Sequence, residues 1–278
     1  MSEPVRPKIV GILNVTPDSF SDGGRWLDAG AAIARGRELV ALGADIVDVG
    51  GESTRPGANR VSPDEEQRRV IPIVETLSAL GIAVSVDTMR ASTAVAAIEA
   101  GAQIINDVSG GLADADMLAV VADSDATFVA MHWRGHSDHM DDLARYDDVA
   151  REVRDELAAR LEAITEAGIE RSRVVLDPGF GFAKNAEQNW ELLARLNELG
   201  TLDVPLLVGV SRKRFLAELL PADAAVTERD LPTSVISCLL AERGVWGVRV
   251  HDVAGTRLAI DTVTRLQSVG RRPAHLKD

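Results

Sequence analysis

Three polar residues, Asp87, Asn106 and Asp177, each follow a short run of apolar residues in this sequence. Apolar runs of this length are typical of strands that are buried on both faces. A carboxylate at such a position costs free energy unless a partner compensates its charge. Together, the three side chains would suit the flat edge of a nitrogen-rich ligand with several hydrogen-bond donors and acceptors. Taken singly, each could instead cap the helix that follows it.

Cationic residues follow the last two apolar runs. Arg212, Lys213 and Arg214 come after the seventh run, and Arg249 and His251 belong to the eighth. Such groups favour an anionic ligand, above all a phosphate, which the backbone amides of a following helix also bind well. A solvated basic turn is the alternative. It explains Arg214 well but explains Arg249 poorly, because Arg249 lies inside an apolar strand.

The first apolar run leads into a stretch of glycine and small polar residues that begins at Asn14 and continues to Gly24. Asn14 offers a side-chain carbonyl oxygen, which is a hard ligand suited to Mg²⁺. With one protein ligand, the ion would be held mainly by water and by a substrate phosphate, as is usual for Mg²⁺. A second long connection covers residues 52–61 and, like the first, is a place where substrate contacts are expected.

Eight apolar runs alternate with helical segments, which predicts an α/β fold with a parallel sheet closed into a (β/α)8 TIM barrel. In this barrel the active site lies at the carboxyl ends of the strands, so the polar residues are expected to converge on one mouth. The expected strands cover residues 9–15, 46–50, 83–87, 104–108, 128–132, 174–177, 206–210 and 247–251.

Signals at the helix ends support this division of the chain. Ser62 and Pro63 are typical of an N-cap and a first helical position. Ser92 is expected to cap a helix over residues 93–100, and residues 149–167 have the spacing of an amphipathic helix. Glycine follows most of the predicted helices, as expected for a left-handed helix end.

The totals predict one domain. The chain has 278 residues, with a single barrel domain expected over residues 1–278 and short flexible tails at 1–7 and 268–278. The net charge of −13 argues against a nucleic-acid partner. No apolar stretch is long enough to cross a membrane, and no secretory leader precedes residue 8. The single cysteine, Cys238, excludes an intrachain disulfide and suits a reducing cytoplasm.

Several motifs in a fixed order resemble those of the dihydropteroate synthase family, over roughly residues 9–257. Any one of them alone would be a weak signal, but the ordered set is highly specific. The matching stretches are residues 14–24, 50–57, 86–88, 106–111, 177–182, 211–213 and 249–252.

The resemblance implies a transferase of folate biosynthesis that condenses 6-hydroxymethyl-7,8-dihydropterin diphosphate with 4-aminobenzoate, the compound that sulfonamides displace. By this resemblance Asp87, Asn106 and Asp177 would hold the pterin edge. Lys213 would reach a ring acceptor, and Arg249 would stack on the ring plane.

The resemblance assigns the diphosphate to Arg249, His251 and, with Mg²⁺, Asn14. It therefore makes Asp177, Lys213, Arg249 and His251 the catalytic set. Family members of this kind suggest a homodimer. The residues expected to line the 4-aminobenzoate pocket are Phe20, Thr54, Arg55, Pro56, Phe182 and Ser211.

Other interpretations remain open at this point. A methyltetrahydrofolate-binding barrel would share the acidic and amide residues but would not need the cations around Lys213 and Arg249. A catalytically silent pterin-binding paralogue should have lost Asn14 or Lys213, yet both are present. Arg214 stands where some relatives place a serine, which leaves the binding of the aminobenzoate carboxylate open. Three histidines between residues 132 and 139 fit no standard zinc spacing.

Overall fold

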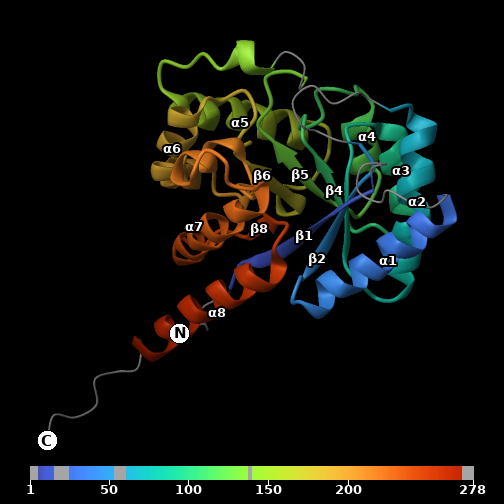
Figure 1. The fold of residues 1–278 in the computed structure, drawn as a ribbon. Helices are drawn as coiled ribbons and strands as arrows, with labels where there is room; N and C mark the ends of the chain where they lie inside the picture. The colour runs from blue at the N-terminus through green and yellow to red at the C-terminus, as the bar shows by residue number, and fades with distance from the viewer. Residues whose placement is uncertain (1–5, 16–24, 53–60, 137–139, 271–278) are drawn as a thin grey trace, which may run out of the picture.

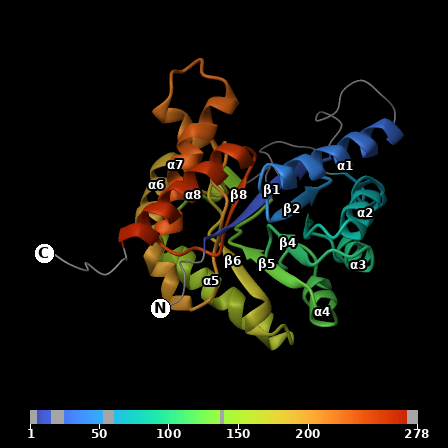
Figure 2. The same cartoon turned by 90° about the horizontal axis from the view of Figure 1, so that it is seen from below.

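A computed structural model describes residues 6–15, 25–52, 61–136 and 140–270. Eight parallel strands alternate with helices in these residues, which confirms the predicted barrel (Figure 1). Viewed at right angles, the strands occupy the centre and the helices surround them (Figure 2). Helices α1, α2 and α3 cover one side of the barrel, and α5, α6 and α7 cover the opposite side.

The strands pair in the order β6-β5-β4-β3-β2-β1-β8-β7. One parallel bridge between Leu176 and Leu206 joins the two ends of this sheet and closes the barrel. Leu176 also donates its backbone N–H to Pro205 O at 2.9 Å. The strands are β1 Lys8–Asn14, β2 Ile46–Gly50, β3 Val84–Asp87, β4 Ile104–Asp107, β5 Thr127–Met131, β6 Val174–Asp177, β7 Leu207–Val208 and β8 Gly247–Val250.

Eight α-helices and five short 3-10 helices connect the strands in the described residues. The α-helices are α1 Arg25–Ala41, α2 Pro63–Ala79, α3 Ala91–Glu99, α4 Met117–Ala122, α5 Val149–Glu166, α6 Ala186–Ala194, α7 Asp230–Glu242 and α8 Val253–Gly270. The 3-10 helices are η2 Met140–Leu143, η3 Arg171–Arg173, η4 Leu196–Leu202, η5 Arg214–Leu219 and η6 Val226–Arg229. No described helix combines the length and the apolar character that a membrane crossing requires.

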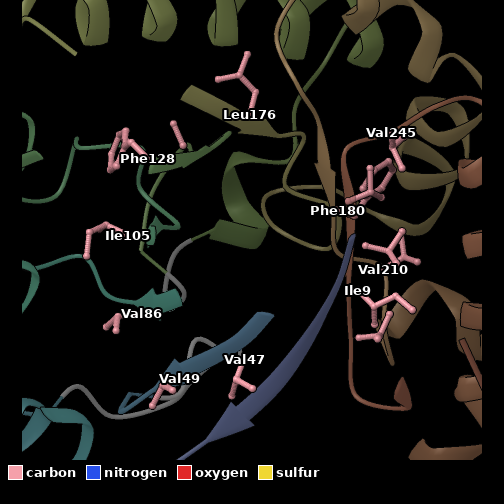
Figure 3. Close-up of a cluster of buried hydrophobic side chains, with 14 of the residues drawn as sticks. Ile9, Val47, Val49, Val86, Ile105, Phe128, Leu176, Phe180, Val210 and Val245 are labelled. Atoms are coloured by element: carbon pink, nitrogen blue, oxygen red, sulfur yellow. The ribbon is translucent and has the colours of Figure 1, made fainter. Parts of the chain in front are cut away.

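Two apolar clusters hold the barrel together. The larger one fills the layer between strands and helices, and Figure 3 shows its side chains on successive strands, including Val47 on β2, Val86 on β3 and Ile105 on β4. The smaller one lies inside the barrel and contains Val10, Ile46, Ile104, Val129, Val175 and Leu207. Side chains two positions apart on a strand face the same way, so this inner cluster forms the floor beneath the next polar layer.

The cap of α2 is as predicted. The Ser62 side chain accepts a hydrogen bond from the backbone N–H of Glu65 at 3.2 Å, and Pro63 is the first helical residue. Such a cap satisfies one of the amides that a helix start leaves without an intrahelical partner.

The predicted cap of α3 by Ser92 is wrong. The helix begins at Ala91, with Arg90 at the cap position and no side-chain cap bond from it. Asp114, from the connection before α4, accepts the Ala91 N–H at 2.8 Å instead. A partner from another element has replaced the local one, which the local sequence could not reveal.

Strand β7 is shorter than predicted, with two residues where five were expected. Beyond it the chain turns immediately, because Lys213 donates its backbone N–H to Val210 O at 3.1 Å. Arg212, inside this turn, has a positive φ of 58°. Of the three cationic residues here, Arg212 pairs with Asp230 on α7, while Lys213 packs against the Phe182 ring.

Candidate active site

The carboxyl ends of all eight strands lie on one rim, called here the mouth. Asn14, Asp87 and Asp177 are the last residues of β1, β3 and β6, and Arg249 lies on β8. The described residues thus place the predicted pterin and diphosphate set at one end of the barrel. The predicted aminobenzoate residues Phe20, Thr54, Arg55 and Pro56 lie outside the described part of the chain.

An ion-pair network links four interior side chains. Arg249 donates from Nη2 to Asp87 Oδ2 at 2.9 Å and from Nε to Asp48 Oδ2 at 2.6 Å. The same Asp48 oxygen accepts from Asn106 Nδ2 at 3.3 Å. The Arg249 guanidinium is therefore fixed by two carboxylates, and Asn106 is fixed by one of them. Charge-assisted bonds of this kind are stronger and more directional than neutral ones.

Asp48 is a member of this network that was not predicted from the sequence. It is fully buried on β2, and its Oδ1 has no hydrogen-bond partner in the described structure. A signal was present, because Asp48 interrupts the apolar run of residues 46–50 just as Arg249 interrupts its own. Each of the two charged residues compensates the other, since an unpaired charge at this depth is strongly unfavourable.

The pKa of the Asp87 carboxyl is shifted, and burial is the main cause. It raises the pKa of Asp87 to about 7, although Arg249 opposes the shift and Asp48 adds to it. Two carboxylates that share one guanidinium repel each other, so the pair holds a proton more easily than an isolated aspartate does. Before a ligand binds, the mouth can therefore take up a proton close to neutral pH.

Asp177 lies beside the same cation. Gly209 lies between the two residues, since a Cβ there would be 3.7 Å from Arg249 Cβ and 3.8 Å from Asp177 Oδ2, and the charge of Arg249 acts to lower the pKa of Asp177. The backbone N–H of Gly179 donates to Asp177 Oδ1 at 2.7 Å. Burial raises the pKa of Asp177 to about 6, while this hydrogen bond and Lys213 act in the opposite direction.

Lys213 reaches the mouth from the turn after β7. Its Nζ lies 4.0 Å from the centre of the Phe182 ring, which is a cation–π contact. Gly181 permits this approach, because a Cβ at that position would come within 2.8 Å of Lys213 Cδ and the backbone there has a φ of +75°. Burial lowers the pKa of Lys213 to about 8; Arg249 adds to the lowering, and Asp177 and Asp87 oppose it.

Ser211 and His251 form a third contact at the mouth. The Ser211 Oγ lies 2.9 Å from His251 Nδ1, and the backbone N–H of His251 donates to the same oxygen at 3.1 Å. The residue predicted to bind aminobenzoate and the one predicted to bind diphosphate are thus in direct contact. Arg214 is the first residue of η5 and, unlike Ser211, is exposed.

Asn14 fits the single-ligand magnesium site that the sequence predicted. Its Oδ1 would lie 3.7 Å from a Cβ at Gly50, and Asp87 Oδ2 would lie 3.9 Å from the same point. The Asn14 oxygen and the Asp87 carboxylate thus both lie close to Gly50 at the mouth, and hard oxygens of this kind suit an ion held mainly by water and phosphate. Among the described residues no group of three or more His, Cys, Asp or Glu side chains could hold a metal by itself.

The described histidines near residue 132 are not arranged around a metal. His132 contacts Lys184 and Glu156, and His136 packs edge-on against Trp133 with 5.0 Å between ring centres. Histidine 139 lies outside the described residues.

A separate cavity lies at the other end of the barrel. It has a volume of about 520 Å³ and is lined by residues that include Arg6, Lys8 and Trp246. Lys8 begins β1, so this cavity lies at the amino ends of the strands. Conserved chemistry in this fold belongs to the carboxyl ends, and the charged network is there. The cavity is therefore separate from the candidate active site.

Known proteins share both the sequence and the fold. A family model described as "pterin binding enzyme" matches residues 10–251. A dihydropteroate synthase from Mycobacterium leprae is 50% identical over 261 residues, covering 92% of each chain. A solved Xanthomonas albilineans dihydropteroate synthase with 4-aminobenzoic acid aligns with a TM-score of 0.87 and 45% identity, covering 96% of this chain and 94% of that one.

A second Xanthomonas albilineans dihydropteroate synthase structure, in complex with 7,8-dihydropteroate, aligns with a TM-score of 0.85 and 41% identity. The alignment covers 96% of this chain and 95% of the other. Identity at this level covers nearly the whole length of both chains and is accompanied by a shared fold. The chain therefore belongs to the pterin-binding enzyme family, among its dihydropteroate synthases.

Proposed function

We propose that the mouth joins the pterin methylene carbon of 6-hydroxymethyl-7,8-dihydropterin diphosphate to the amine of 4-aminobenzoate. The products are 7,8-dihydropteroate and diphosphate. The observation that carries this proposal is the network of Arg249 with Asp87 and Asp48, with Asp177 adjacent to it. On one rim, this network places carboxylates that can bind a nitrogen-rich ring near cations that can bind a diphosphate.

The pterin edge is assigned to Asp87, Asn106 and Asp177. Carboxylate and amide oxygens can accept the N–H groups of the ring, and the Asn106 amide can also donate. Lys213 can donate to a ring acceptor, and its packing against Phe182 limits its movement. Arg249 presents a planar guanidinium that two carboxylates hold in place, so it can stack on the ring.

We infer a dissociative substitution. The bond between the methylene carbon and the diphosphate oxygen breaks first, and the electron pair leaves with the diphosphate. The resulting cation is delocalised over the pterin, where the negative charges of Asp177 and Asp87 stabilise it. Arg249 and His251 compensate the negative charge that develops on the departing group, because it forms within their reach.

Mg²⁺, with Asn14 as its protein ligand, would supply additional positive charge to the diphosphate when bound. The donor set supports this proposal, since an amide oxygen beside a carboxylate is a hard oxygen environment.

The second half of the reaction needs no strong base. The aniline nitrogen of 4-aminobenzoate attacks the methylene carbon while uncharged, and the new C–N bond leaves an extra proton that passes to water or diphosphate. Phe182 and Ser211 are assigned to the aminobenzoate pocket, together with Phe20, Thr54, Arg55 and Pro56. Excluding water is their main task, because water would trap the same cation.

Diphosphate release from the pterin substrate tests the proposal directly. We expect release that depends on 4-aminobenzoate and that a sulfonamide inhibits competitively with it. Release that ignores the amine, or no release at all, would remove the proposed reaction. Pterin binding without any release would instead indicate a silent pterin-binding paralogue.

We further propose a homodimer formed through α7 and α8, which lie side by side in Figures 1 and 2. Leu231, Val235 and Leu239 recur every four residues on α7 and are 73%, 54% and 51% exposed. Leu258 and Leu266 on α8 are 71% and 68% exposed. An apolar surface of this extent supports burial against a second copy.

A cytoplasmic location is also proposed. Its support is the single cysteine, Cys238, which is free and half-buried on α7. A chain that uses no intrachain disulfide is typical of a reducing compartment.

A further inference from the structure

Lys184 is a buried cation that none of the proposed steps uses. It lies in the segment between β6 and α6, with 5% of its surface exposed. A lysine at this depth is costly unless its charge and its donors are satisfied. Its partners therefore indicate what it does.

Three acceptors surround the Lys184 Nζ. They are Gly179 O at 3.0 Å, His132 Nδ1 at 3.1 Å and Phe182 O at 3.2 Å. An ammonium group has three N–H donors, so the number of acceptors matches the protonated form. A neutral amine has only two N–H donors and would lose one of these contacts.

One peptide unit connects Lys184 to Asp177. The N–H of Gly179 donates to Asp177 Oδ1 at 2.7 Å, and the carbonyl of the same residue accepts from Lys184. A second connection runs through His132, whose backbone N–H donates to Asp177 O at 2.8 Å. The Asp177 side chain and backbone are thus each one residue away from the Lys184 ammonium.

A third connection leads to Lys213. Lys184 holds the carbonyl of Phe182, and the ring of Phe182 packs against Lys213 Nζ at 4.0 Å. The neighbouring Gly179 and Gly181 both have positive φ, at 70° and 75°, so the segment is tightly folded. Fixing the two carbonyls fixes the position of the aromatic ring.

His132 and Glu156 support Lys184 from behind. Because His132 Nδ1 accepts from Lys184, the ring proton belongs on Nε2, which lies 2.9 Å from Glu156 Oε2. Burial lowers the pKa of His132 to about 4, and Lys184 adds to the shift, so the imidazole is neutral at physiological pH. Arg134 also pairs with Glu156 and holds that carboxylate in place.

We propose that Lys184 is a positioning residue of the reaction. Its ammonium, supported by His132 and Glu156, fixes residues 179–184 so that Asp177 and Phe182 take their places at the mouth. This role rests on the proposed pterin chemistry, but it predicts an effect on pterin binding that can be measured without turnover.

Lys184 also acts on Asp177 through charge. Burial lowers the pKa of Lys184 to about 7, and Asp177 opposes that shift. The reciprocal effect of Lys184 is to lower the pKa of Asp177. The other titratable and charged groups that face Lys184 are Arg134 and Tyr146 from the connection after β5, His132, Glu156 from α5 and Lys213 from the turn after β7.

Kinetics of Lys184→Met test the proposal, because methionine keeps most of the volume but has no donor and no charge. We expect kcat/KM for the pterin substrate to fall by roughly 10- to 100-fold. We also expect the acidic limb of its pH profile to move to higher pH, because Asp177 loses a nearby cation.

Lys184→Arg should restore part of the rate and return the limb toward its original place. Lys8→Met, at the opposite end of the barrel, is the matched control and should match the parent.

A folded Lys184→Met protein with parental kcat/KM and an unmoved profile would overturn the proposal. If that variant does not fold, Lys184→Gln decides the same question. Equilibrium binding of the pterin substrate to either variant, measured without 4-aminobenzoate, does not depend on the proposed reaction. Weaker binding than in the parent supports the positioning role even if no turnover occurs, and parental binding contradicts it.

The unmodified protein provides an independent test. The chain has five histidines, so ¹⁵N spectra of histidine-labelled protein are simple. We expect His132 to remain neutral with its proton on Nε2 across the range in which the enzyme is active. A proton on Nδ1 would leave Lys184 without this acceptor and would contradict the arrangement.

Discussion

Arg249 and Asp48 face each other inside the barrel, with 2.6 Å between Nε and Oδ2, although 201 positions separate them in the chain. Strands β8 and β2 that carry them are both neighbours of β1. This pairing holds the guanidinium at Nε, while Asp87 holds it at Nη2 at 2.9 Å. Asp48 therefore helps to orient a cationic group at the mouth.

Replacing Asp48 by asparagine should weaken the hold on Arg249. Loss of one charge-assisted hydrogen bond is worth about 1.5 kcal/mol, so we expect kcat/KM for the pterin substrate to fall by roughly 10-fold. Steady-state kinetics measure this change. Asp45→Asn is the matched control, because Asp45 pairs with Arg6 at the other end of the barrel at 2.6 Å. Equal kinetics for Asp48→Asn and the parent would contradict the orienting role.

Asp177→Asn removes a charge at the pterin edge but keeps an oxygen that can accept from Gly179. We expect the fold to survive and kcat/KM for the pterin substrate to fall by roughly 30-fold, equivalent to about 2 kcal/mol. Circular dichroism and steady-state kinetics check the two parts. Normal binding with parental turnover would show that Asp177 has no part in the reaction.

The pH dependence of kcat/KM should be bell-shaped, because this parameter reports groups of the free enzyme. Asp177 and Asp87, whose pKa values are raised to about 6 and about 7, must lose their protons to stabilise a pterin cation, so the rate should rise through this pH range. Lys213 and Lys184, whose pKa values are lowered to about 8 and about 7, must keep their protons, so the rate should fall as the pH rises through this range.

Lys213→Arg identifies the alkaline limb of this profile. A guanidinium stays protonated throughout the range, so the limb should move to higher pH even if the maximum rate drops. An alkaline limb that stays in place would assign it to another group.

Magnesium dependence should report on Asn14. We expect a chelator to abolish turnover, and Asn14→Ala to raise the Mg²⁺ concentration needed for half-maximal rate by roughly 10-fold. Titration of the rate with Mg²⁺ measures this. Asn14→Asp keeps a hard oxygen and should stay much closer to the parent. Full activity of the metal-free protein would remove the ion from the proposal.

A charge on the exposed face of α7 should separate the proposed dimer. Val235→Glu would place a carboxylate in the apolar contact, which is unfavourable when buried without a partner. Sedimentation velocity should show a dimer for the parent and a monomer for the variant. Leu80→Glu, at an exposed leucine just after α2, is the control and should remain dimeric. A monomeric parent would contradict the assembly.

The positions of the strands follow from local pattern. Short apolar runs, helix caps such as Ser62 and the motifs around Asp87, Asn106 and Asp177 are all contained in a few neighbouring residues. The barrel follows because eight buried strands that alternate with helices have few other ways to cover both faces of a sheet. Periodicity and length carry this information without any knowledge of distant contacts.

The local sequence pattern did not predict contacts in which a residue far away in the chain, rather than a neighbouring one, supplies the partner. Ser92 has the right type for an N-cap, but Asp114 from another connection accepts the first amide of α3. Asp48 has the same apolar surroundings as a core position, and only its pairing with Arg249 reveals its task. In both cases the deciding contact spans more of the chain than a sequence window contains.

By itself, the sequence determined the fold class, the family and which polar residues end at the mouth. Tertiary structure alone decided how they pair: Asp48 with Arg249, Ser211 with His251, and the Lys184 ammonium with three acceptors. The physical reason is that strand position depends on local hydrophobic pattern. The protonation and orientation of a buried charge depend instead on the few groups that closure of the barrel brings within about 3 Å of it.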